Sequence, residues 1–194
     1  MVKSGYKYVQ ESFQKHDKTH NSSQWNRMIK FRKFNTVQRV KKPTNVGRAR
    51  NLGYKAKQGY VLAITKVRTG TMHKIRPKMG RKNANLAVNK ITTKKNLKWI
   101  AEERTAKHYP NLEVLNSYKV GFDGKKHYFE VIMVDPNHPN IQNDSKINWI
   151  CERNNRGRVF RGLTSSGKKT RGLHKKGWGS EKNRPSLNAK KNLR

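Results

Sequence analysis

Acidic residues are absent from a long part of this chain, and that absence constrains its fold more than any other feature. No Asp or Glu occurs between Lys18 and Ala101, although Lys and Arg are frequent there. Eight of the 11 acids then fall between Glu102 and Glu152, and only Glu181 follows. A mixed-charge surface is typical of a domain that faces water. We therefore interpret the middle of the chain as a folded domain and the flanks as segments with anionic surroundings.

The overall charge limits the partners of the chain. Its 194 residues include 46 Lys and Arg, the formal net charge is +35, and only 32% of residues are hydrophobic. Such a charge repels itself in a compact state and needs a counter-charge from nucleic acid, an anionic membrane surface or an acidic protein. The apolar runs are too short to span a membrane, and the N-terminus lacks an apolar segment typical of a secretion signal. We expect a cytoplasmic location and no membrane partner.

A basic segment is joined directly to an apolar one near the end of the acid-free stretch. Arg48 to Gln58 alternates cations with small residues and one aromatic, Tyr54, and we expect a loop there. Lys and Arg can meet phosphates, glycine allows close approach, and tyrosine can stack on a base. The alternative is an ordinary solvated loop. Tyr60 to Val67 is apolar and rich in β-branched residues, which is typical of a strand.

Two helices are predicted before this segment. Ser4 can cap the first, which runs through Phe13. The second begins at Ser22 or Ser23 and has apolar residues at helical spacing: Trp25, Met28, Ile29 and Phe34. Its opposite face is basic, and such a helix can lie on a membrane. The basic character continues into glycine-rich loops, however, which favours RNA.

A third helix is predicted over 93–108, capped by Thr92 or Thr93, with Glu103 and Lys107 forming an i,i+4 pair. Two strands follow, Leu112 to Val120 and Lys126 to Val134. The Gly and Asp residues between them are a strong hairpin signal. Further along, Asp144 can cap a short helix that includes Ile147 and Ile150.

These elements predict an α+β fold, with a small, mostly antiparallel sheet packed with helices and long basic extensions that bind RNA. We expect a helical and loop extension over 1–58, a core domain over 59–153 with a basic internal loop at about 68–90, and a C-terminal extension over 154–194. No further core is expected beyond Arg153. We also expect the extensions to become ordered on binding.

The most suggestive catalytic motif is GLTSSGKK at 162–169. It fits the phosphate-binding pattern G-x-x-x-x-G-K-[ST] except that Lys169 replaces the hydroxyl residue that would hold magnesium. A basic segment, and not a buried strand, leads into it. Nucleotide hydrolysis is therefore disfavoured, although the backbone N–H groups and lysines suit a static phosphate.

Metal and thiol chemistry are also disfavoured. His16 and His20 can share a helix face, but no acidic or cysteine partner stands at a suitable spacing. Cys151 is the single cysteine, which we interpret as a buried structural residue. We predict no enzyme activity, no metal, no cofactor and no small-molecule substrate.

Over nearly its whole length the sequence resembles a known family. The two longest matching segments are RARNLGYKAKQGYV at 48–61 and RGLTSSGKKTRGL at 161–173. The others are YKYVQE at 6–11, AEER at 101–104, LEVLNSYKVG at 112–121 and FEVIMVDPNHP at 129–139. They are similar to those of the large-subunit ribosomal protein L15e family of archaeal and eukaryotic ribosomes. Phe122 and Ser166 depart from the acid and the alanine that are usual there.

The resemblance implies a structural constituent of the large ribosomal subunit that binds 23S-type ribosomal RNA and neighbouring ribosomal proteins. Mapped onto this chain, the basic motifs of the family nominate RNA contacts at Arg48, Arg50, Lys55, Lys57, Arg161, Lys168, Lys169 and Arg171. Composition alone adds Arg76, Arg81, Arg156, Arg158, Lys175 and Lys176. The aromatic residues that can stack on bases are Tyr54, Tyr60 and Trp178.

Two other functions are compatible with parts of this pattern. A DNA-compacting chromatin protein would have a similar composition, and it would bind duplex DNA and RNA equally. An RNA-modifying enzyme would need a cofactor pocket, for which the sequence gives no sign. The motifs at 48–61 and 161–173 favour the ribosomal interpretation over both.

Overall fold

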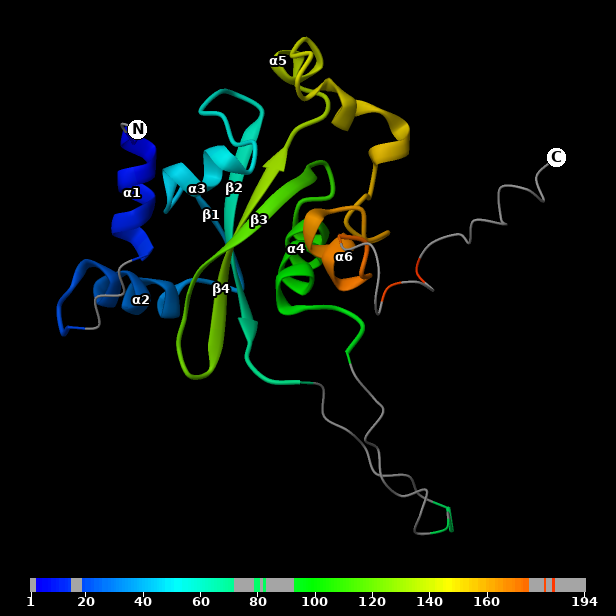
Figure 1. Cartoon of the computed structure of the whole chain (residues 1–194). Coiled ribbons are helices and arrows are strands. Elements are labelled where there is room, and N and C mark those ends of the chain that lie inside the picture. Colours follow the sequence, from blue (N-terminus) through cyan, green and yellow to red (C-terminus); the bar gives the residue numbers. More distant parts are fainter. Residues whose placement is uncertain are drawn as a thin grey trace.

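The computed structural model describes residues 3–14, 19–71, 79–80, 82, 93–174, 180 and 183. Within these residues, four strands form one antiparallel sheet in the order β1-β2-β4-β3 (Figure 1). The strands are β1 (Val37–Val40), β2 (Tyr60–Arg68), β3 (Glu113–Phe122) and β4 (Lys126–Val134). With the helices packed on it, this sheet confirms the predicted α+β fold.

The two central strands are covered on both faces. β2 pairs with β4 from Tyr60 opposite Val134 to Arg68 opposite Lys126. Because successive side chains point to opposite faces, Leu62 and Ile64 pack on one side of the sheet while Ala63 packs on the other. This explains why both strands read as almost continuous apolar runs.

Helix α4 (Leu97–His108) covers one face of the sheet. Its Trp99 and Ala106 pack with Ala63 and with neighbouring residues of β3 and β4, and Ala101 packs with Val67. A hydrogen bond of 2.6 Å between the hydroxyls of Thr65 and Thr105 lies within this layer.

Three helices lie on the opposite side: α1 (Gly5–Gln14), α2 (Ser23–Lys33) and α3 (Val46–Asn51). Phe31 of α2 packs on Ile64 and Tyr128, and Ala49 of α3 packs on Leu62 and Ile132. Helix α1 packs on α3, farther from the sheet.

The chain after β4 contains short helical turns. They are α5 (Pro139–Gln142), the 3₁₀ helices η2 (Asn148–Cys151) and η3 (Arg153–Asn155), and α6 (Ser165–Thr170). Ile141, Ile147 and Ile150 bury themselves against Val134 and the start of β2. Helix α6 lies beside α4 (Figure 1).

Several local predictions are confirmed. The first two helices and the strand from Tyr60 form as expected, and the β3–β4 hairpin turns at Asp123 and Gly124. Ser22 caps α2, because its hydroxyl accepts a hydrogen bond of 3.2 Å from the backbone N–H of Trp25. The caps, the β-branched runs and the turn residues are local signals, so the sequence is sufficient to find them.

Other local predictions are wrong. Helix α4 is capped by Asn96, whose side chain accepts 2.7 Å from the N–H of Trp99, and it therefore begins four residues later than predicted at Thr93. Glu103 pairs with Lys95 at 2.7 Å and not with Lys107. Within the predicted loop that starts at Arg48, the first residues are helical.

Strand β1 and the cap at Asp144 also differ from expectation. Strand β1 was not predicted, because the VQRV run of Val37–Val40 is short and half polar. Asp144 does not cap η2 through its side chain, whose Oδ1 accepts from the N–H of Lys146 at 3.1 Å. The predicted boundaries at 58/59 and 153/154 stay predictions.

The segment after Arg153 contributes to the core, contrary to expectation. Val159 is fully buried in the cluster beneath α4, and its carbonyl accepts 2.8 Å from the indole N–H of Trp99. Thr164 and Ser166 are buried as well. The sequence does not indicate this packing, because Val159 lies among basic and glycine residues.

We expect Val159→Ala to lower the free energy of unfolding by about 2 kcal/mol, because it deletes two buried methyl groups and leaves a cavity. Urea unfolding followed by tryptophan fluorescence measures this. Val9→Ala is the matched control, since Val9 is half exposed on α1, and its effect should stay within about 0.5 kcal/mol. Equal effects of the two changes would mean that the segment after Arg153 does not pack on α4.

Candidate nucleic-acid interface

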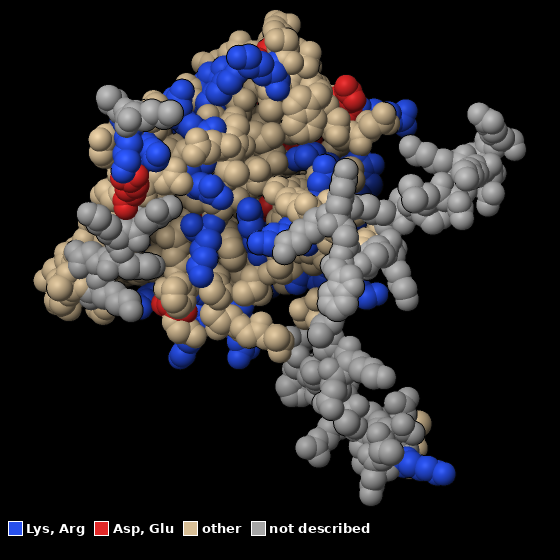
Figure 2. Space-filling view, in the orientation of Figure 1, with Lys and Arg blue, Asp and Glu red and all other residues tan. Residues whose placement is uncertain are grey.

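Many of the acids of the chain are used inside the protein. Glu102 and Glu130 are fully buried and Glu113 is 8% exposed, so the interpretation of the middle as a mixed-charge surface is wrong for these three. Asp123 and Asp144 each form ion pairs with basic side chains. The surface therefore keeps fewer acids than the sequence suggests, and Figure 2 shows far more Lys and Arg than Asp and Glu on the face that it presents.

The carboxylate of Glu130 ties the segment before α3 to the sheet. One oxygen accepts from the N–H and hydroxyl of Thr44 at 3.0 and 2.5 Å, and the other accepts 2.7 Å from the hydroxyl of Tyr118. That hydroxyl in turn accepts 3.1 Å from the N–H of Asn45. Burial raises the pKa of Glu130, and burial together with the neighbouring carboxylate raises the pKa of Tyr118.

Helix α3 begins directly at this anchor and presents its arginines outward. The side chain of Asn45 caps it by accepting 2.9 Å from the N–H of Arg48. Gly47 and Ala49 are buried, while Arg48 and Arg50 are exposed. The alternation places both guanidinium groups on the surface, on a helix whose start is fixed from below.

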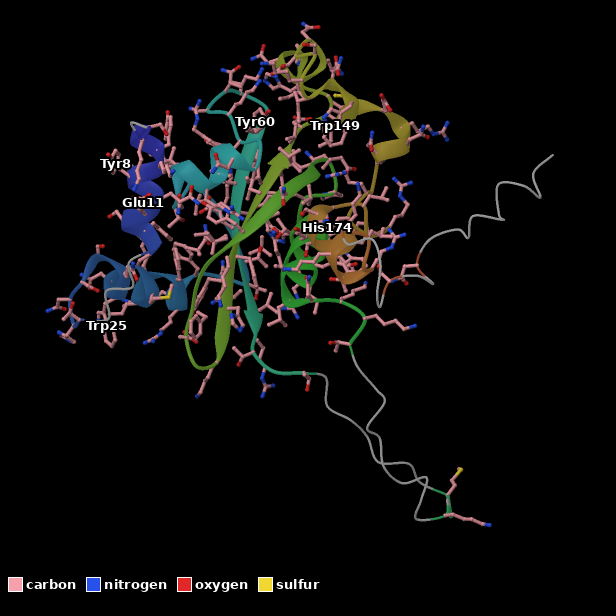
Figure 3. All side chains as sticks on the ribbon, viewed as in Figure 1. Tyr8, Glu11, Trp25, Tyr60, Trp149 and His174 are labelled. Atoms are coloured by element: carbon pink, nitrogen blue, oxygen red, sulfur yellow. The ribbon has the colours of Figure 1, made fainter. Side chains whose placement is uncertain are left out.

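Close packing of α1 on α3 depends on Gly47. A Cβ atom there would lie 2.6 Å from the backbone oxygen of Tyr6, which is too close for any other residue without a backbone shift. The Arg50 guanidinium lies 4.6 Å from the centre of the Tyr6 ring, and Asn51 donates to Gln10 at 3.3 Å. In Figure 3 the labelled residues Tyr8 and Glu11 lie on α1.

The turn after α3 carries two predicted contact lysines that share one acid. Lys55 and Lys57 donate to the same Asp144 oxygen at 2.8 and 2.6 Å. Both lysines lower the pKa of Asp144 by stabilising its charged form. Tyr54 makes an edge-to-face contact with Tyr60, with 5.9 Å between the ring centres, at the start of β2 (Figure 3).

Arg158, which composition nominated as an RNA contact, lies inside the protein. It is 9% exposed, and its Nη1 donates to the carbonyls of Val114 and Leu115 at 2.7 and 3.0 Å. Its guanidinium also lies 5.0 Å from the centre of the Trp149 ring, and burial lowers its pKa. The carbonyls belong to a bulge in edge strand β3, so Arg158 covers backbone groups that would otherwise lack partners.

A second buried carboxylate anchors α6. Glu102 accepts hydrogen bonds from the hydroxyl of Ser117 and, at 2.6 Å, from the hydroxyl of Thr164. Thr164 is also the N-cap of α6, since its hydroxyl accepts 3.3 Å from the N–H of Gly167. Burial raises the pKa of Glu102, as it does that of Glu130.

The glycines of the GLTSSGKK motif serve packing. A Cβ atom at Gly167 would lie 2.6 Å from the backbone of Gly162, and Gly162 has a positive φ of 67°. The N–H groups of Gly167 and Lys168 both bond to Thr164. Two of the backbone donors of the motif are therefore engaged within the protein. That the motif holds a static phosphate stays a prediction, and Lys168 and Lys169 are exposed cations.

Cations from three separate helices converge beside β3. Burial lowers the pKa of Lys98 on α4, and the charges of Arg48 on α3 and Lys169 on α6 lower it further. The charge of Glu102 raises the pKa of Lys98, but Glu102 is fully buried and its carboxylate is bonded to hydroxyls. Figure 1 shows α3 on one side of β3, with α4 and α6 on the other. We call the Arg48, Lys98 and Lys169 side chains the three-helix cation cluster.

Three further arginines extend this basic region. Arg156, Arg161 and Arg171 are exposed. Backbone carbonyls hold two of them, since Arg161 donates to Asn154 and, at 3.0 Å, to Arg156, and Arg171 donates 3.2 Å to Gly162. Their side chains are thereby oriented before any ligand arrives.

Some predicted contacts fall outside the described residues: Arg76, Arg81, Lys175, Lys176 and Trp178. Sequence reasoning in turn missed Lys98, because this lysine lies outside the basic motifs that nominated the RNA contacts. A basic residue four positions before the buried Glu102 was the available signal.

The described residues contain no group of three or more His, Cys, Asp or Glu side chains that could hold a metal ion. Cys151 is half-buried, so the expectation of a buried cysteine holds only in part, and burial raises the pKa of its thiol. No helix within the described ranges is long and apolar enough to cross a membrane.

Comparison with known families identifies the chain. Residues 4–190 match the sequence model of the family described as Ribosomal L15. The chain belongs to the ribosomal protein L15e family.

Membership of the L15e family gives the protein a structural role in the large ribosomal subunit, and it confirms the predicted absence of enzyme activity, since the family is not enzymatic. In general terms, its partners are ribosomal RNA and other ribosomal proteins.

The buried carboxylate of Glu130 predicts a pH dependence. Because burial raises its pKa, the folded chain binds this proton more tightly than the unfolded chain. The stability contributed by Glu130 therefore falls as pH rises from its ordinary pKa through the raised one. Glu130→Gln removes this titration, so the stability of the variant relative to the wild type should rise with pH above about pH 4, where a glutamate ordinarily titrates.

Urea unfolding of both proteins across that range measures this difference, and titrations common to both cancel. A relative stability of Glu130→Gln that falls with rising pH would contradict the prediction. Such a result would mean that the Thr44 and Tyr118 donors stabilise the anion more than burial penalises it.

Proposed function

We propose that this L15e chain binds large-subunit ribosomal RNA through the three-helix cation cluster and the exposed arginines beside it. The observation that carries the proposal is that α3, α4 and α6 all contact β3, with Arg48 and Lys169 exposed on two of these helices and their charges acting on Lys98 of the third. Like charges brought together in this way cost free energy in the isolated protein. An RNA phosphate among them removes that cost.

The chemistry is charge neutralisation by a surface of defined shape. Each Lys or Arg that meets a phosphate releases condensed counterions, so affinity falls steeply as salt increases. Arginine can also pair with phosphate through two parallel hydrogen bonds. Since Arg161 and Arg171 are already oriented by backbone carbonyls, less side-chain entropy is lost when they bind.

The nominated residues do not contribute equally to this proposal. Arg48, Arg50, Lys168 and Lys169 are exposed on α3 and α6 and are the central contacts. Lys55 and Lys57 share the charge of Asp144, so their net contribution to phosphate binding is smaller. Arg158 is assigned a structural role. The family match favours ribosomal RNA over the DNA-compacting alternative.

Arg48→Ala combined with Lys169→Ala tests the cluster, because these residues are distant in sequence while the charges of both act on Lys98. Filter binding to deproteinised large-subunit ribosomal RNA over a range of salt concentrations measures the effect. We expect weaker binding and a slope of log affinity against log salt that is smaller by about 2, one unit for each lost phosphate contact.

The matched control is Arg104→Ala with Lys107→Ala, which removes the same charges from the exposed side of α4. It should leave the slope nearly unchanged. If both double variants change the slope equally, binding follows total charge and the cluster is not a specific contact.

A further inference from the structure

Two hollows lie along the edge strand β1. The first, of about 760 Å³, lies between α2 and β1, and the second, of about 530 Å³, lies between β1 and the start of β2. Both are lined by Arg39, Val40 and Lys41. The two hollows therefore share the residues of β1, and we call them together the β1 groove.

The first hollow combines an apolar floor with basic walls. Phe31, Phe34, Val40 and Ile64 supply the apolar surface. The cations that line it come from α2 and from the β1 region: Arg27, Lys30, Arg39, Lys41 and Lys42. A site of this composition suits a ligand that has both flat apolar groups and negative charges.

The second hollow adds aromatic rings. Tyr54 and Tyr60 line it together with Val61 and Leu62, and the planes of the two rings are 85° apart. Both tyrosines are partly exposed. Because two perpendicular rings cannot both be covered by their mutual contact, the pair leaves ring surface free for stacking.

Within the described part of the chain, none of the residues that line either hollow is acidic. Behind the lining lies Glu130, which bonds to Thr44 and whose charge acts on Arg27. Glu130 is fully buried and accepts three hydrogen bonds. The groove therefore presents positive charge next to apolar and aromatic surface.

We propose that the β1 groove binds a short unpaired stretch of RNA, with phosphates on Arg39 and Lys41 and a base stacked on Tyr54. This inference rests on the proposed function and names a second contact with a different kind of RNA structure. A paired A-form helix keeps its bases inside the stack and offers mainly phosphates and 2′-hydroxyls. Only unpaired nucleotides can place bases on the aromatic and apolar surface while their phosphates reach the cations.

The charge pattern decides between RNA and an extended peptide. Strand β1 pairs on one side only, with β2, and an added strand can pair with its free edge. A peptide occupant would have to be acidic along its length to match five lining cations, and it would make no particular use of the tyrosine rings. An unpaired RNA strand would use both the lining cations and the tyrosine rings.

The test compares two fluorescein-labelled probes, a single-stranded RNA of ten nucleotides and a duplex of the same length. Dissociation constants of the full chain for both probes are measured at one salt concentration. Tyr54→Leu should lower the ratio of single-strand to duplex affinity about tenfold, since a stacked base is lost. Tyr54→Phe keeps the ring and should retain the wild-type ratio.

The cations are tested in the same way. Arg39→Gln with Lys41→Gln should weaken single-strand binding more than duplex binding. Arg104→Gln with Lys107→Gln is the charge-matched control and should leave the ratio unchanged. Photo-cross-linking of the single-stranded probe, followed by mass spectrometry of the peptides, should locate the contact at 39–42 and 54–60.

Two outcomes would overturn the inference. If Tyr54→Leu and Arg39→Gln with Lys41→Gln leave the ratio unchanged, the groove does not select unpaired RNA, although the three-helix cation cluster can still bind ribosomal RNA. If a ten-residue acidic peptide binds with dependence on Arg39 and Lys41 but not on the Tyr54 ring, the groove belongs to a protein partner. Failure of the salt-slope test on Arg48 and Lys169 would instead contradict the proposed function itself.

Discussion

Two buried glutamates hold the basic surface of this protein in place. Glu130 accepts from Thr44, just before α3, and Glu102 accepts from Thr164, which caps α6. Each short basic helix thus begins next to a carboxylate buried at the sheet or beneath α4. Burying a carboxylate is costly unless hydrogen bonds compensate it, and here hydroxyl and N–H donors offset part of that cost. A chain with few apolar residues uses these polar anchors where a larger core is not available.

The anchors link the fold to function. Arg48 and Lys169 lie on helices of six residues each, which are too short to be stable alone. Because α3 is attached at its start to the sheet and α6 to α4, these helices hold their cations in fixed positions, and less conformational entropy is lost on binding. Cations held together in this way repel one another, so RNA contributes to the stability of the region that binds it.

The sequence was sufficient where signals are local and insufficient where they depend on tertiary contacts. The hairpin at Asp123, the cap at Ser22 and the strand from Tyr60 have local signatures. Buried glutamates do not, because a charged residue reads as surface until its partners are known. Arg158 illustrates the same limit: composition makes it an RNA contact, whereas β3 carbonyls distant in sequence take its donors. Family segments identified the basic residues of α3 and α6, but the helical structure of these segments and their relation to Lys98 required the fold.

The central claim is that this L15e chain is held in the large subunit by its contacts with ribosomal RNA. Sedimentation of the tagged protein from a lysate, after a high-salt wash and with or without ribonuclease, tests it most directly. We expect comigration with the large subunit that resists the wash, because many phosphate contacts act together, and that is lost after extensive RNA digestion. Migration with DNA, or release from the subunit by mild salt, would contradict the claim.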